Sequence, residues 1–159
     1  MSTAFYLKFD GVEGESTLKD HKGEIVVLSW AWGASQASAV SPGGGSGKGK
    51  AVAGEFQFTH PYDKASPMLA KQCVSGKHFK EAKLVARKAG EGQKDYLLVT
   101  LKEVFISSVQ ASGAAGGEVS ESVSCSYADI EFSYKPQDAK GALGAEVKFG
   151  WNTKTSATR

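Results

Sequence analysis

Two long segments, 95–110 and 118–135, change partway along which of their alternate positions are apolar. In the first segment the apolar row is Leu97, Val99 and Leu101, followed by Val104 and Ile106. In the second it is Val119, Val123, Cys125 and Tyr127, followed by Ala128, Ile130, Phe132 and Tyr134. Since alternate side chains of a strand point to opposite faces, such a strand must be bulged, bent or shared between two sheets. The paired changes, in segments joined by the glycine-rich hairpin connection 113–117, favour a barrel or an orthogonal sandwich.

Five further segments have the alternation and the β-branched or aromatic content of strands. They are 4–9, 24–35, 52–59, 78–88 and 146–153. One short helix is predicted between the third and the fourth: Ser66 is placed to cap it, Pro67 suits its first position, and Gly76 can end it. The 159 residues therefore predict a single, mostly β domain over 1–159, a size that removes roughly 70% of the unfolded surface from water.

The segment 24–35 carries apolar residues at both parities. One row is Val26, Leu28, Trp30 and Trp32, and the other is Ile25, Val27, Ser29, Ala31 and Gly33. Membership of an otherwise aliphatic row predicts that the two tryptophans are core residues rather than an exposed stacking platform. The opposite row becomes small and polar, which suits a surface against another subunit or water.

The stretch 35–51 loses all periodicity and is rich in Gly, Ser and Ala, which predicts a flexible loop. Its glycine-lysine run resembles a phosphate-binding loop. That motif requires a glycine five positions before the Gly-Lys pair and a hydroxyl after it, where Pro42 and Gly49 stand. A strand rather than a helix follows, so nucleotide binding is not predicted. The polar tail 153–159 is expected to be frayed.

Composition excludes several functional classes. Nineteen basic and seventeen acidic residues are interspersed, giving a formal charge of +2 and no sign of a nucleic-acid groove. No stretch has the pattern of a signal peptide or a membrane-spanning helix, which predicts synthesis in the cytoplasm and no membrane insertion. Cys73 and Cys125 are expected to be reduced and packed in that compartment.

The sequence offers no catalytic constellation. The histidines His21, His60 and His78 are isolated, and neither cysteine has a second ligand at zinc-site spacing, so no metal or cofactor is predicted. No serine lies in a nucleophile-elbow motif, and His78 has no partner that would make it a general base. Single charges are expected to be solvated. Those singled out are Glu55, Lys80, Glu121 and Glu131.

Several blocks of the sequence together resemble one family. They are Gly14-Glu15-Ser16, His21, Glu24-Ile25, Val27-Leu28-Ser29-Trp30, Trp32-Gly33, Ser75-Gly76-Lys77-His78-Phe79, Ala82, Leu84, Arg87-Lys88-Ala89-Gly90, Tyr96, Leu101-Lys102-Glu103-Val104, Ile106-Ser107-Ser108 and Gly150-Trp151-Asn152. In order and spacing, over residues 4–152, they are similar to the haemolysin-coregulated protein (Hcp) family of type VI secretion systems.

The resemblance implies a non-enzymatic protein with a small β-barrel of two sheets, flanked by one helix. It implies homohexameric rings that stack into the inner tube of a contractile secretion machine, with effector proteins in the lumen. Sheath, baseplate and spike proteins are the further partners implied. The tube is propelled out of the cell, so a cytoplasmic protein reaches the extracellular space without a signal peptide.

Within that framework, Ser29, Ala31 and Gly33 are candidate lumen-facing positions. The candidate ring-stacking loop is Gly43, Gly44, Gly45, Ser46 and Gly47. Two alternatives stay open: a monomeric β-barrel that binds a small ligand against its tryptophans, and an enzyme, prompted only by the glycine-lysine run.

Overall fold

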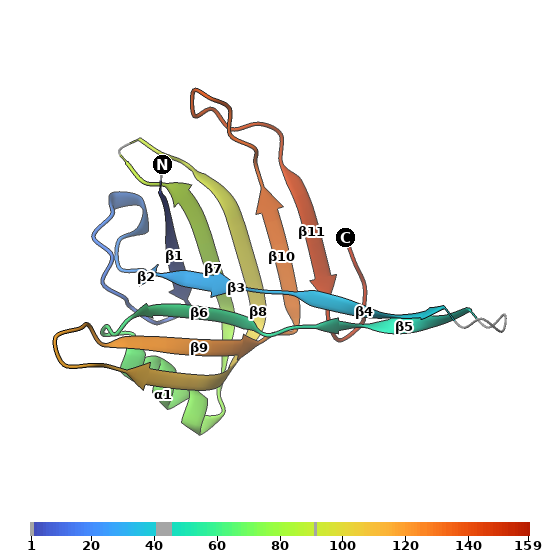
Figure 1. Cartoon of the computed structure of the whole chain (residues 1–159), viewed down its shortest axis with the longest axis horizontal. Helices are drawn as coiled ribbons and strands as arrows, with labels where there is room; N and C mark the ends of the chain where they lie inside the picture. Colours follow the sequence, from blue (N-terminus) through green and yellow to red (C-terminus); the bar gives the residue numbers. More distant parts are fainter. Residues whose placement is uncertain (1, 41–45, 91) are drawn as a thin grey trace.

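The computed structural model describes residues 2–40, 46–90 and 92–159. Its strands, one α-helix and one 3-10 turn are drawn in Figure 1. They are β1 (Thr3–Phe9), η1 (Lys19–His21), β2 (Ile25–Val27), β3 (Ser29–Ala31), β4 (Ala34–Val40), β5 (Ser46–Ala53), β6 (Phe56–Pro61), α1 (Ser66–Ser75), β7 (His78–Lys88), β8 (Asp95–Ser112), β9 (Ser120–Ser126), β10 (Asp129–Tyr134) and β11 (Val147–Asn152). The prediction of a mostly β chain with one helix is confirmed.

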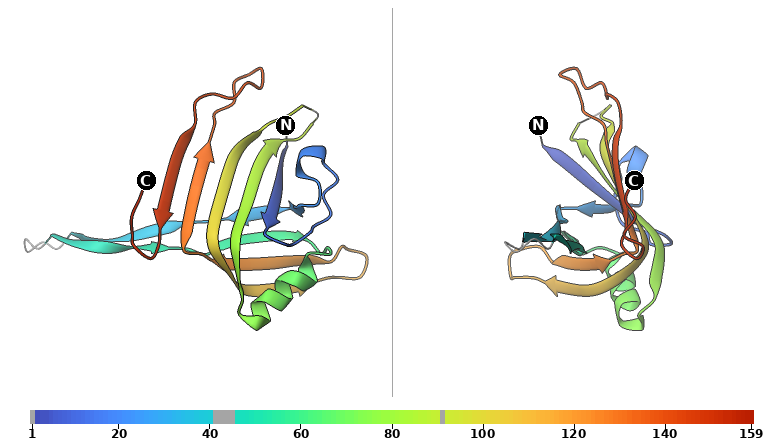
Figure 2. Two further views of the ribbon diagram at one scale, coloured as in Figure 1. Left: turned by 180° about the vertical axis from the view of Figure 1, so that it is seen from behind. Right: turned by 90° about the vertical axis from the view of Figure 1, so that its right-hand side faces the viewer.

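The strands form two crossing layers. Hydrogen-bonded neighbours follow the order β2-β1-β7-β8-β9-β6-β3, and β10 joins β8 and β11. Figure 1 and Figure 2 show β1, β7, β10 and β11 as an upright layer that crosses the flatter layer of β3, β6 and β9, with α1 beneath. The expected barrel needs correction, because among the described residues the end strands β2 and β3 do not pair with each other.

Strand β8 belongs to both layers. Its first half pairs with β10, where Leu101 lies opposite Ile130, and its second half pairs with β9, where Ile106 lies opposite Cys125. Between the halves Glu103 has a φ of 53°, in the left-handed region that non-glycine residues seldom adopt. The change of parity predicted near 102–103 is therefore confirmed as the corner between the layers.

The second long segment of the sequence, 118–135, is interrupted beside the same corner. The predicted strand 118–135 is two strands, β9 and β10, separated at Tyr127 and Ala128. The Ala128 N–H donates to the carbonyl of Lys102 at 2.9 Å, beside the corner of β8. The predicted change of parity thus corresponds to a transfer of the chain between layers.

The predicted strand 24–35 changes parity as well, which the sequence analysis missed. Ile25 and Val27 are buried, whereas Val26 and Leu28 are 41% and 57% exposed. Beyond Leu28, the tryptophans at 30 and 32 pack against the core. The core prediction for the tryptophans is supported, but the row that included Val26 and Leu28 was wrong.

Helix α1 begins differently from the prediction and ends as predicted. Ser66 lies inside the helix, and its hydroxyl accepts from the N–H of Asp63 at 3.1 Å instead of capping. The Asp63 carboxylate accepts from the N–H of Ala65 at 2.9 Å. Gly76 ends the helix with a φ of 68°, as predicted.

Strands β4 and β5 form an antiparallel hairpin that projects from the body (Figure 1). It replaces most of the structureless loop predicted over 35–51; the flexibility of this segment stays a prediction. Gly43, Gly44 and Gly45 lie outside the described residues. The tail 153–159, expected to be frayed, folds back so that Arg159 and Gly150 exchange two backbone hydrogen bonds of 2.9 Å.

Gly54, at the base of the hairpin, lies against the backbone of Gly33. A Cβ at Gly54 would lie 2.6 Å from the carbonyl oxygen of Gly33, whereas a Cβ at Gly33 would meet no atom of the described residues within 4 Å. Gly54→Ala should lower the free energy of unfolding by about 1–3 kcal/mol, because backbone must shift to admit the methyl group. Gly33→Ala is the matched control and should change it little. Urea denaturation measures both, and equal losses would contradict this account.

Candidate lumen and assembly surfaces

The outward face of the flatter layer carries small uncharged side chains. The register places Thr59 of β6 opposite both Ser29 of β3 and Ser122 of β9, and Ser122 opposite Gln110 of β8. The next row is Ala31, Gln57, Ser124 and Ser108. These eight positions include no charged residue, although protein surfaces commonly carry charge at about a quarter or more of positions. We call these eight residues the neutral face.

The neutral face includes two of the three candidate lumen positions. Ser29 and Ala31 are exposed on β3, and the Ser29 and Thr59 hydroxyls are hydrogen bonded at 2.6 Å. Gly33 is exposed just beyond β3, where the hairpin begins. Sequence reasoning missed the members on β6, β8 and β9: alternation shows that their side chains share parity, but not which strands are neighbours.

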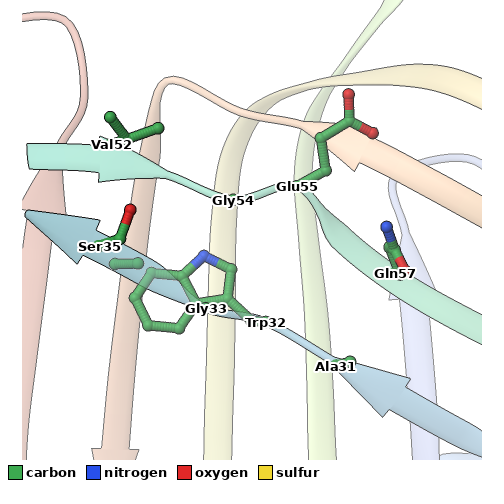
Figure 3. Close-up of a pocket in the computed structure, with 9 residues that line it drawn as sticks. Ala31, Trp32, Gly33, Ser35, Val52, Gly54, Glu55 and Gln57 are labelled. Atoms are coloured by element: carbon green, nitrogen blue, oxygen red, sulfur yellow. The ribbon is translucent and has the colours of Figure 1, made fainter.

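An open hollow of about 440 Å³ lies where the hairpin leaves the body. Figure 3 shows Trp32 and Ala31 on one strand of this hollow, with Glu55 and Gln57 on the other. The Trp32 indole N–H donates to the hydroxyl of Tyr127, which donates to the Gly54 carbonyl at 2.7 Å. These bonds fix the base of the hairpin.

The tryptophans fill space against other rings rather than lining an enclosed cavity. Trp30 stacks on Phe56 with ring centroids 5.8 Å apart, and Trp32 lies 5.1 Å from Phe132. Burial and the charge of Glu55 raise the pKa of Tyr127 and outweigh the hydrogen bond from Trp32, which acts to lower it. The Tyr127 side chain therefore stays neutral. The geometry therefore gives the small-ligand alternative no support.

One charge expected to be solvated is buried. Glu121 is 3% exposed, and its Oε1 lies 2.9 Å from Nε2 of His60, which is fully buried. The other imidazole nitrogen of His60 has no hydrogen-bond partner within the described part of the chain; a carboxylate oxygen of Asp63 lies 3.8 Å away. The sequence contained a signal for the burial of Glu121, because this residue alternates in step with the buried Val123 and Cys125. Glu55 is exposed but accepts a hydrogen bond from Ser107.

The described residues contain no cluster of His, Cys, Asp and Glu suited to hold a metal ion. Within the same part of the chain, no helix has the length and apolarity needed to cross a membrane.

Comparison with known proteins identifies the family. The family model described as "Type VI secretion system effector, Hcp" matches residues 6–134. A relative named Protein hcp1, from Pseudomonas aeruginosa, is 45% identical over 157 residues, covering 97% of each chain. The chain belongs to the Hcp family. Among solved structures, a type six secretion system protein superimposes with a TM-score of 0.93 at 32% identity, covering 99% of this chain and 100% of its own. Hcp1 from Salmonella typhimurium gives 0.82 at 33%, covering both chains fully.

Several residues that carry the Hcp resemblance have a structural role in this chain. The imidazole of His21 lies 2.9 Å from Glu24 and 3.0 Å from Asp95. The guanidinium of Arg87 donates to Asp95 at 2.7 Å and to Asp20 at 3.3 Å. Burial opposes the charge of Arg87, but these two carboxylates outweigh it and raise the pKa of Arg87. The cluster ties the β1–β2 connection to β7 and β8.

The two cysteines of this Hcp chain are free thiols with unequal access. Cys125 is fully buried, and burial together with the charge of Glu55 raises the pKa of its thiol. Cys73, on α1, is partly exposed.

Thiol labelling of the folded protein checks this difference. We expect iodoacetamide to modify one thiol per chain in the native state and two in guanidinium chloride, because the Cys125 thiolate is disfavoured and inaccessible. In the Cys73→Ser variant, native labelling should disappear. Rapid native modification of Cys125 would show that the core opens.

Proposed function

We propose that this chain is a tube subunit of a type VI secretion system. Homohexameric rings would stack into the inner tube, carry effector proteins in the lumen and be exported with them. Sheath, baseplate and spike proteins are the further partners of this proposal. The end-to-end similarity to Hcp proteins, with 45% identity to one of them, is the observation that carries it.

The lumen is proposed to be lined by the neutral face, beginning at Ser29 and Ala31. Interface cores that hold subunits together permanently are enriched in aromatic residues, Met and Arg and poor in Ser and Ala. A hydroxyl-rich face of this kind suits reversible contact with cargo instead. Gly33 would extend it toward the hairpin.

Stacking of rings is proposed to involve the β4–β5 hairpin together with Gly43, Gly44, Gly45, Ser46 and Gly47; the first three of these glycines lie outside the described residues. The hairpin projects beyond the two layers, which supports contact with a neighbouring subunit (Figure 2). Ordering of a flexible glycine-rich segment on contact, as the sequence predicts here, would reduce the net affinity, so isolated rings would stay dispersed until a tube is nucleated.

The solution mass of the purified protein tests the ring. Light scattering should give six times the mass of one chain, and electron microscopy should show annular particles, because a heterologous contact closed by rotation forms a ring. A single-chain mass at high concentration, without annular particles, would refute the proposal and favour a monomeric binding protein.

The position of Ala31 can be located within those particles. Ala31→Cys in a Cys73→Ser background, labelled with a maleimide gold cluster, should place density in the central opening, because Ala31 is exposed on the neutral face. Val74→Cys, on helix α1 and 84% exposed, is the matched control and should place gold away from the centre. Central gold from Val74→Cys with peripheral gold from Ala31→Cys would reverse the assignment.

A further inference from the structure

The core-facing side of the upright layer extends beyond the part that other residues of the chain cover. Tyr134 pairs with Val147, and both lie on the same side of the sheet as the buried pair Ile130 and Trp151. Tyr134, Val147 and Phe149 are nevertheless 45%, 65% and 38% exposed. An apolar portion of the inner face at β10 and β11 is therefore uncovered; we call Tyr134, Val147 and Phe149 the inner patch.

The opposite edge of the same layer has exposed apolar residues on its other side. Ile25 and Val27 of β2 point into the core, so Val26 and Leu28 point outward; we call these two residues the outer patch. β2 ends the pairing order at this edge, as β11 does at the other. Figure 1 shows the two strands on opposite sides of the molecule.

We propose that the inner patch of one copy covers the outer patch of the next, so that the subunits overlap like shingles around the ring. This assignment rests on the proposed ring and names its contact. The patches differ, lie at opposite edges and face opposite sides, which makes the contact heterologous, and a heterologous contact can close into a ring.

Charge at the two edges is complementary. Residues 10–24, beside β2, carry five acidic and two basic side chains, and residues 135–159, which include β11, carry five basic and two acidic ones. Some of these charges are already paired: Arg159 with Asp129 and Glu131, Asp20 with Arg87, Glu13 with Lys64, and Lys148 with Glu146. Without the paired residues, the first segment keeps three acidic and two basic side chains and the second keeps three basic and one acidic, so the edges still have opposite signs, which favours a second copy in this orientation.

The test uses two substitutions at exposed positions, Leu28→Asp and Val147→Asp. Each variant alone should fall from six subunits to one in native mass spectrometry, because a charge would be desolvated at every junction. An equimolar mixture should form a dimer, since an intact inner patch from Leu28→Asp meets an intact outer patch from Val147→Asp. Val74→Asp, at an exposed position of α1, is the control and should keep six subunits.

The outcomes separate this contact from the ring itself. A single-chain mass for the unmodified protein would overturn the proposed function. Six subunits in either single variant would overturn the contact and leave the ring standing. The same conclusion would follow if the mixture gave no dimer while both variants melted at the temperature of Val74→Asp.

A second measurement avoids disruptive charges: with Cys73→Ser, the pair Val26→Cys and Val147→Cys should give bis-maleimide ladders up to six chains. Either cysteine alone should give none; ladders from one alone would refute heterologous packing.

Discussion

The fold depends on one strand that serves two layers. β8 can pair with β10 and then with β9 only because its inward-facing parity changes at Glu103, where the backbone takes a φ of 53°. A non-glycine residue in this region costs of order 1–3 kcal/mol, which the burial of Leu101, Val104 and Ile106 on both sides of the corner offsets.

Other breaks between consecutive strands have different local structures. At Tyr127 and Ala128 the chain leaves β9 and enters β10, and at Leu28 it passes from β2 to β3. At Gly54 the close approach of the Gly33 carbonyl leaves no room for a side chain. Because these breaks accompany the corner of β8, the two layers cross and share one apolar core.

Periodicity predicted most strands and the parity change in β8, because both depend on which side of a strand is buried. The end of α1 was predictable for a different reason, because Gly76 can adopt the left-handed conformation that ends a helix. Periodicity failed at Val26 and Leu28, since apolar residues at both parities leave the inward row ambiguous. It also missed β4 and β5: the side chains at 34–37 and 50–52 are exposed, so neither side of these parts of the hairpin must be apolar and their composition resembles that of a loop. The neutral face was only partly predictable, since alternation does not determine strand order.

The buried ionisable side chains agree with a structural role. Arg87 and His21 each have carboxylate partners, and His60 is paired with Glu121, so these contacts hold separate elements together. Loss of one partner would leave an uncompensated buried charge, which is more costly than the pair is favourable.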